Sequence, residues 1–154
     1  MKNNYFSKIS ILLIFPLSFL LVNKIQANSL KNNIRVVALT SLTADLINTI
    51  SKDSLVGIPG SSILKKNKEF DSIPIVSSGR MPPDLEKILS LKPDLVIGAK
   101  GFHDRSLSKL NSLGISTLST SISSLDDLDN LNKKLASKLK TRTKSLEEIL
   151  KNCY

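Results

Sequence analysis

Few residues in this 154-residue sequence have side chains that could carry out a reaction, and they do not form a known catalytic pattern. The chain contains one histidine, His103, and one cysteine, Cys153. These counts exclude a multi-histidine metal site, a cysteine-rich zinc site and an intramolecular disulfide. The sequence also lacks the G-x-S-x-G nucleophile elbow and the G-x-x-x-x-G-K-S/T phosphate loop. We therefore expect a protein that is not an enzyme and that has no resident metal or cofactor.

Three aspartates lie close together in the sequence, and two interpretations of them differ in chemistry. Asp126, Asp127 and Asp129 could bind a cation, but their spacing is not that of a calcium-binding loop. Acidic residues in the first turn of a helix also interact favourably with the helix dipole. We expect this second role and assign no metal to the group.

The basic excess of the chain does not indicate a nucleic-acid partner. The formal net charge is +9, from 22 basic and 13 acidic residues. Three of the lysines lie in the first 27 residues, which contain no acid, so residues 28–154 have 19 basic and 13 acidic residues and a net charge of +6. These basic residues are dispersed, and no aromatic residues alternate with them. We expect a solvated basic surface and no nucleic acid.

The first 27 residues have the order of features found in a secretory signal peptide. Lys2 and Lys8 precede the apolar segment 9–22, and Ala27 ends a small-residue cleavage site. The apolar segment is shorter than the ~20 residues that span a bilayer, which favours cleavage over an uncleaved N-terminal anchor. We expect residues 1–27 to be removed and the mature protein to be periplasmic.

Strand and helix patterns alternate along the chain from residue 34. Apolar runs rich in β-branched residues predict strands, and apolar residues spaced by three or four predict helices. Gly114 follows the last of these helices, where a left-handed cap is expected. The predicted strands are 34–39, 55–58, 73–76, 94–98 and 115–118, and the predicted helices are 41–51, 84–92 and 104–113. Strands joined by helices run parallel, so the expected fold class is α/β, a Rossmann-like, mostly parallel sheet flanked by helices.

Residues 124–151 have the longest helical pattern in the sequence. Ser124 and Asp127 have the spacing of a capping box, and leucines recur at steps of three, four or seven. Polar residues around Arg142 interrupt this apolar stripe. We expect an α/β lobe over 28–123 and one long amphipathic helix in 124–154, which either closes the domain or serves as a spacer that pairs with a partner.

The ligand site is expected in the loops that follow the strands, because ligands of open parallel sheets bind beyond the carboxyl ends of the strands. These loops contain small hydroxyls, glycines, two cations and one aromatic ring. Such a set favours an anionic or chelated small molecule over an apolar one. Each residue also has a plainer role, since the two cations could be solvated and the histidine could cap a helix. The expected ligand-binding residues are Ser41, Ser61, Arg80, Lys100, Phe102 and His103.

Several segments, in order along the chain, resemble one known family. The most specific is PDLEKILSLKPDLVI at 83–97, which is followed by LNSLGI at 110–115. RVVALTSLT at 35–43 and LVGI at 55–58 match the first strand, first helix and second strand of the same family. Together they resemble the N-terminal lobe of the class III periplasmic solute-binding proteins. These helical-backbone receptors deliver cobalamin, iron-siderophores or haem to ABC importers.

The resemblance implies a receptor that holds its ligand between two α/β lobes and binds it without a reaction. A glutamate on each lobe of these receptors docks to the permease, and Glu86 matches the glutamate of the first lobe. The alternative for Glu86 is an acid that only favours the dipole of its helix. The expected partners are therefore a metal chelate or corrinoid and an ABC transporter permease.

The sequence shows no counterpart of the family's second lobe after residues 124–154, so we expect that lobe to be absent. Three explanations remain: a shortened receptor, a half-receptor that works with a separately encoded second lobe, and a single-lobe protein with a new role. Two hypotheses for function follow. The first is the periplasmic substrate-binding component of an ABC importer, or a truncated half of it. The second is an exported interaction domain, or a non-functional truncated receptor, without a role in transport.

Overall fold

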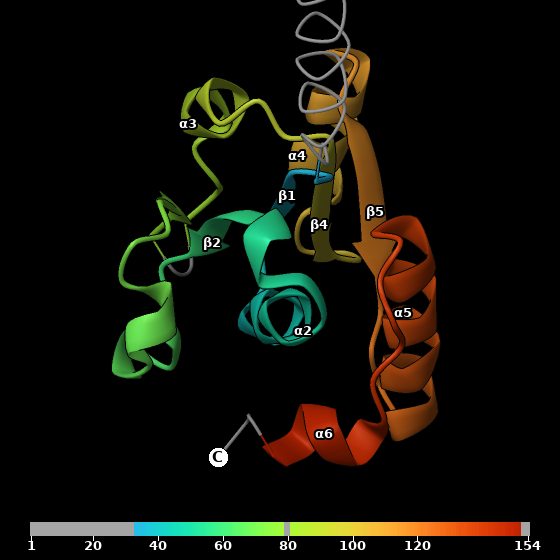
Figure 1. Cartoon of the computed structure of the whole chain (residues 1–154). Helices are drawn as coiled ribbons and strands as arrows, with labels where there is room; N and C mark the ends of the chain where they lie inside the picture. The colour runs from blue at the N-terminus through green and yellow to red at the C-terminus, as the bar shows by residue number, and fades with distance from the viewer. Residues whose placement is uncertain (1–32, 79–80, 152–154) are drawn as a thin grey trace, which may run out of the picture. The chain divides into compact units, whose positions relative to one another are not determined.

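The computed structural model of the chain describes residues 33–78 and 81–151. The predicted signal peptide over 1–27 lies outside these residues, as do Arg80 and Cys153. Within them, five parallel strands form one sheet in the order β3-β2-β1-β4-β5. Helices alternate with the strands along the chain (Figure 1). The predicted α/β fold with a parallel sheet is confirmed.

The strands and helices are short. The strands are β1 (Val36–Ala38), β2 (Leu55–Pro59), β3 (Ile75–Ser77), β4 (Leu95–Ala99) and β5 (Ser116–Thr120). The helices are α2 (Ser41–Ser51), α3 (Leu85–Ser90), α4 (Asp104–Ser112), α5 (Leu125–Lys138) and α6 (Leu146–Lys151). Three single turns of 3-10 helix complete the described chain, at Lys52–Ser54, Leu64–Lys66 and Lys68–Phe70. No helix in the described ranges is both long and apolar enough to cross a membrane.

Successive residues of the central strands point to opposite faces of the sheet, as the two-residue period of a strand requires. In β4, Leu95 and Ile97 belong to one buried cluster, whereas Val96 belongs to another. The same alternation separates Val36 from Val37 in β1. Both faces of the sheet are therefore apolar, and both must be covered by helices.

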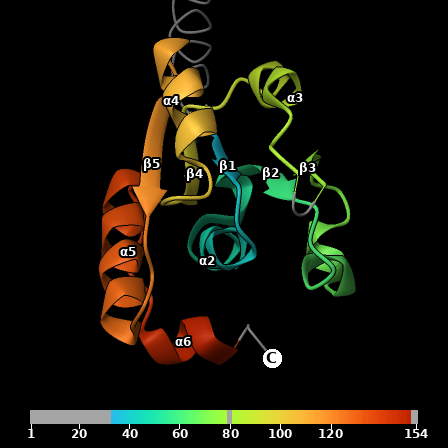
Figure 2. The ribbon, with the colours of Figure 1, turned by 180° about the vertical axis from the view of Figure 1, so that it is seen from behind.

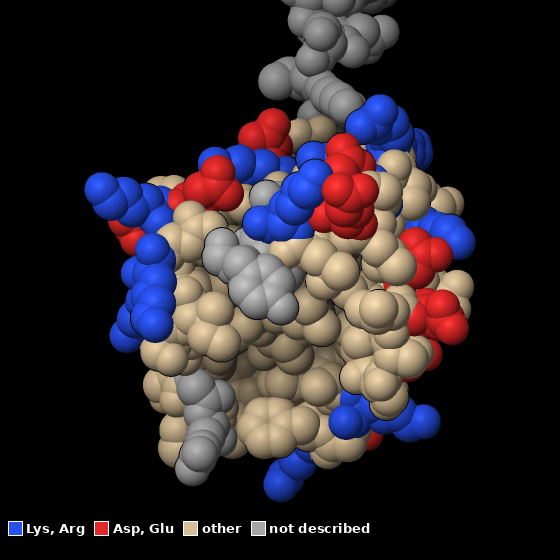
Figure 3. Space-filling model, turned by 90° about the horizontal axis from the view of Figure 1, so that it is seen from below, with Lys and Arg blue, Asp and Glu red and all other residues tan. Residues whose placement is uncertain are grey.

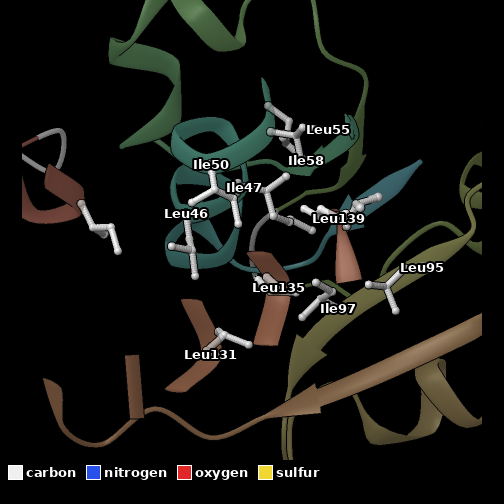
Figure 4. Packing of buried hydrophobic residues seen from close by; sticks show 14 of the residues in the cluster. Leu46, Ile47, Ile50, Leu55, Ile58, Leu95, Ile97, Leu131, Leu135 and Leu139 are labelled. Carbon is white, nitrogen blue, oxygen red and sulfur yellow. The ribbon is translucent and has the colours of Figure 1, made fainter. Parts of the chain in front are cut away.

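Helices α2, α5 and α6 contribute to the cluster on one face, and α3 and α4 contribute to the cluster on the other. Figure 4 shows the first cluster, in which Leu46 and Ile47 of α2 face Leu131 and Leu135 of α5. Figure 2, the view from behind, shows α4 in front of the sheet and α2 beyond it. The sheet is thus the middle layer of three.

Two predicted signals at helix ends are confirmed. The Ser124 side chain accepts a hydrogen bond from the Asp127 N–H at 3.1 Å, and the Asp127 carboxylate accepts one from the Ser124 N–H at 3.0 Å. This reciprocal pair is the predicted capping box at the start of α5. Gly114 follows α4 with a φ of +86°, the left-handed conformation that glycine adopts without a steric penalty.

The structure corrects the expectation of one long helix in 124–154, because this segment has two helices. α5 ends at Lys138 and α6 begins at Leu146. Lys140 has a φ of 53°, and beyond it the chain returns along α5, where the Asn132 Nδ2 donates a hydrogen bond to the Lys144 carbonyl at 2.7 Å (Figure 1). This turn brings Ile149 of α6 into the cluster formed by α2 and α5, with 2% of its surface exposed. Burial of this apolar side chain favours the turn over a straight helix.

Candidate ligand-binding site

The carboxyl ends of all five strands lie at one edge of the sheet, because every neighbouring pair of strands is parallel. β1 and β4 are neighbours, yet the chain passes from β1 to β2 on one side and from β4 to β5 on the other. Loops that follow such a pair diverge, and the opening between them is the usual ligand position in α/β proteins. We call this region the carboxyl edge. The loops after β1 and β4 bring Ser41 and residues 100–103 to it.

The loop after β1 enters α2 through two threonines. The Thr40 Oγ1 accepts a hydrogen bond from the Thr43 N–H at 3.3 Å and lies 2.8 Å from the Thr43 Oγ1. This cap fixes the start of α2 at the carboxyl edge. Ser41, the first residue of α2, is half-buried, and Leu42 beside it is exposed. The predicted residue Ser41 therefore lies at the carboxyl edge together with an apolar neighbour.

The loop after β2 contains the predicted residue Ser61. Its Oγ accepts a hydrogen bond from the Ile63 N–H at 3.2 Å, which holds the loop in a tight turn. A cavity of ≈ 570 Å³ lies between this loop and β3, and its lining includes Gly60, Lys65, Ile75, Ser77, Ser78 and Lys87. Two lysines, two serines and the carboxylate of Asp84 thus line the hollow at the β3 side of the carboxyl edge. The predicted residue Arg80 lies outside the described residues.

The loop between β4 and α4 contains three predicted residues with different exposures. Lys100 is exposed and Phe102 is 63% exposed, whereas only 6% of His103 is exposed. The His103 Nδ1 accepts a hydrogen bond from the Ala99 N–H at 3.0 Å, so this nitrogen is already occupied. Burial lowers the pKa of His103 below its ordinary value of 6.5, and it outweighs two influences that raise this pKa, a hydrogen bond with the Ala99 backbone and the charge of Asp104. Lys100 and Phe102 face solvent at the carboxyl edge, while His103 lies beneath them.

Four exposed apolar side chains lie in the segments that follow the carboxyl ends of β1 to β4, and sequence reasoning identified only Phe102 among them. Leu42, Ile63, Met81 and Phe102 are 36%, 66%, 63% and 63% exposed and follow β1, β2, β3 and β4 in turn. We call them the apolar rim. β5 points toward the lower part of Figure 1, and Figure 3, seen from below, shows charged side chains at the border of a hollowed, uncharged centre. Ile63, Met81 and Phe102 lie outside regular α-helices and strands and belong to no hydrophobic repeat, so only their positions after strands could have indicated them.

The carboxyl edge combines apolar surface with serines and lysines, and this combination is suited to binding. Apolar side chains can cover a flat apolar face of a ligand, while hydroxyl and ammonium groups pair with its polar border. The described residues contain no group of three or more histidine, cysteine, aspartate or glutamate side chains that could hold a metal ion. The sequence favoured an anionic or chelated ligand over an apolar one, and the apolar rim adds an apolar face to that expectation.

Glu86 lies in the first turn of α3, outside the apolar rim. The helix is capped by Asp84, whose carboxylate accepts a hydrogen bond from the Lys87 N–H at 3.0 Å. Asp84 already places an acidic group at the helix start, so α3 does not depend on Glu86 for that role. The Glu86 side chain is exposed and accessible to a partner.

Comparison with known proteins identifies the family. Residues 36–149 match a family model described as periplasmic binding protein. The chain belongs to this family. Its similar solved structures include an ABC transporter substrate-binding protein from Listeria monocytogenes EGD-e, with 28% sequence identity and a TM-score of 0.61. The alignment covers 77% of this chain and 43% of that protein. No curated protein shows a significant sequence match.

Two further structures show the same fold at lower sequence identity. The periplasmic vitamin B12 binding protein of Vibrio cholerae has 23% identity and a TM-score of 0.60, and the alignment covers 79% of this chain and 46% of that protein. A periplasmic haem-binding protein from Pseudomonas aeruginosa has 22% identity and a TM-score of 0.59, with coverage of 79% and 40%. This periplasmic binding protein chain therefore spans less than half the length of each of the three structures.

Proposed function

We propose that this chain is a ligand-binding lobe of the periplasmic substrate-binding component of an ABC importer. Its ligand is a metal chelate or corrinoid of the iron-siderophore, cobalamin or haem type, and the lobe binds it without catalysis. The observation that supports this proposal most directly is the apolar rim, which lies at the position where parallel sheets bind ligands. Membership of the periplasmic binding protein family supports the role in transport.

The chemistry of the carboxyl edge supports a ligand with an apolar face and a polar border. The ring of Phe102 and the side chains of Ile63 and Met81 offer contact area without charge. Lys100 and the hydroxyl of Ser61 can pair with carboxylates or amides at the ligand's border. A macrocycle that holds a metal ion and has polar substituents combines these two features.

A tight complex needs a second wall, because good binding sites enclose most of the surface of their ligand. The carboxyl edge supplies one wall only, and its apolar rim is open to solvent. A second α/β lobe, either continuous with this one or separately encoded, would supply the other. In this arrangement Glu86 would dock the loaded lobe to the ABC transporter permease through a basic surface.

Calorimetric titration of the purified chain with cobalamin, haem and a ferric siderophore tests the proposal. We expect at least one of the three to bind with a Kd below about 0.1 mM, which is a standard binding free energy more negative than about −5.5 kcal/mol. Binding of none of them at this level would contradict a role in ligand capture by this lobe. That result would favour the alternative, an exported interaction domain with no role in transport.

A further inference from the structure

The loop between β4 and α4 is closed by a reciprocal pair of hydrogen bonds. The Ala99 N–H donates to the His103 Nδ1 at 3.0 Å, and the His103 N–H donates to the Ala99 carbonyl at 2.9 Å. Ala99 ends β4 and His103 directly precedes α4, so the pair fixes the loop to the sheet at both of its ends. Lys100 and Phe102, which lie at the carboxyl edge, are held between these two points.

The imidazole of His103 occupies a closely fitted position above β4. A Cβ on Gly98 would lie 2.8 Å from the His103 Cβ and 3.2 Å from a Leu107 methyl carbon, so a side chain there would displace the histidine. The Phe102 ring meets the imidazole edge-on, with 4.7 Å between ring centroids and 77° between planes. The exposed Phe102 ring therefore rests on a buried histidine whose position is set by the sheet.

The hydrogen bond fixes the protonation state of His103. The Ala99 N–H can donate only to an unprotonated Nδ1, so the closed loop requires the neutral imidazole with its proton on Nε2. A second proton would place an N–H group at Nδ1 opposite the Ala99 N–H. Two donors then face each other, and the loop loses one of the two hydrogen bonds that join Ala99 and His103.

We infer that His103 is a positioning residue of the carboxyl edge and an acid-sensitive latch, which holds the loop of Lys100 and Phe102 in its binding conformation when neutral and releases it when protonated. The latch is a property of the free chain. Its effect on a ligand rests on the proposed function, because the released loop contains the Phe102 side chain of the apolar rim.

Asp104 is the charged group that opposes the effect of burial on His103. Asp104 accepts a hydrogen bond from the Gly101 N–H at 2.9 Å and one from the Ser119 hydroxyl at 3.1 Å, and its charge favours a protonated imidazole. β4 and β5 have no titratable residue. The cationic residues on the loop and on α4 are Lys100, Arg105 and Lys109.

Burial is the largest influence on His103 and lowers its pKa below 6.5. The unfolded chain and the released loop therefore bind the proton more readily than the closed loop does. Stability of the closed loop is complete above pH 6.5, falls as the pH drops below this value, and reaches its minimum below the pKa of the closed state.

NMR of the purified chain tests the latch without any ligand, and His103 gives the only imidazole signals in the sequence. We expect its pKa to lie below 6.5. The exchange rate of the Ala99 amide, corrected for its intrinsic pH dependence, should rise at least about tenfold relative to that of Val96 as His103 becomes protonated. An unchanged ratio after His103 has titrated would overturn the inference.

His103→Asn is the matched variant, because the amide oxygen of asparagine can accept the Ala99 N–H but does not titrate. We expect the relative exchange rate of Ala99 in this variant to be independent of pH between 5 and 8. A pH dependence equal to that of the native chain would also overturn the inference. The titration of the native chain remains decisive if the variant does not fold.

Titrations with cobalamin, haem and the ferric siderophore at pH 7.5 and pH 5 then separate the latch from the proposed function. For a ligand that binds, we expect the affinity at pH 5 to fall at least threefold in the native chain and to stay unchanged in His103→Asn. Equal losses of affinity in the native chain and in His103→Asn would show that the latch does not control ligand binding. If cobalamin, haem and the ferric siderophore all fail to bind at either pH, the proposed function fails, and the exchange data alone decide the latch.

Discussion

Phe102 and Leu113 are exposed apolar residues at opposite ends of α4, and the comparison of the two tests the apolar rim. Phe102 precedes α4 at the carboxyl edge, and Leu113 follows α4 at the other edge of the sheet. They are 63% and 54% exposed. Their solvent exposure is similar, whereas their positions relative to the proposed ligand site differ.

We predict that Phe102→Ala weakens binding of the ligand identified by calorimetry about tenfold or more. The reason is that an aromatic ring buried by the ligand contributes more than about 1.4 kcal/mol of contact free energy. Leu113→Ala is the control and should leave the Kd unchanged. Calorimetry on both variants gives the result. Equal affinities for Phe102→Ala and the native chain would remove this ring from the site.

The residues of the candidate site differ in how far the sequence predicts their positions. Ser41 and Lys100 follow from the rule that ligands bind beyond strand ends, because the strands themselves are clear in the hydrophobic pattern. The apolar rim could not be predicted in full, since Ile63 and Met81 lie in loops where exposure depends on the packing of distant segments. The part that His103 plays in holding its loop depends on Gly98 and on a backbone N–H, which no spacing rule reveals.

At the scale of elements, local signals predicted helix starts and ends better than helix length. The capping box at Ser124 and the left-handed Gly114 depend on neighbours within four residues. The break between α5 and α6 depends on contacts across the fold. The Thr141 hydroxyl donates to the Ile50 carbonyl at 2.9 Å, and Asn132 holds the returning chain. An apolar stripe alone does not contain these contacts, so it predicted one long helix.

The packing of α6 can be tested through Ile149, its most buried residue. We predict that Ile149→Ala lowers the free energy of unfolding by about 2–5 kcal/mol, because it removes a buried side chain and leaves a cavity. Glu147→Ala, on the exposed side of the same helix, should change it by less than about 0.5 kcal/mol. Urea denaturation provides the measurement. A loss for Ile149→Ala as small as that of the control would show that α6 does not pack on α2 and α5.

At the scale of the whole molecule, one surface should serve the ligand and another the transporter. The carboxyl edge has the apolar rim, whereas Glu86 is exposed on α3 and is not required as its cap. Separate surfaces allow the two functions to be changed independently. The comparison structures extend well beyond the part that this chain matches, so assays of transport need the complete importer.

We predict that Glu86→Ala reduces ligand uptake in a complete transport system, while the Kd of the lobe for its ligand stays unchanged. The variant removes a carboxylate that, under the proposed function, pairs with a basic group of the permease at an interface with low dielectric. Glu147→Ala, which also removes an exposed glutamate, is the control. If uptake with Glu86→Ala is as fast as with the native protein, Glu86 does not dock to the permease and only interacts favourably with the helix dipole.

The central claim is that the carboxyl edge of the sheet captures a metal chelate or corrinoid. The most direct measurement is a map of amide chemical shifts in the labelled chain, recorded as the ligand that binds in calorimetry is added. We predict that the largest shifts occur in residues 40–42, 61–63 and 100–103, with none of comparable size around Leu113 and Lys140. Shifts centred on the opposite edge of the sheet, or on α5 and α6, would contradict the account.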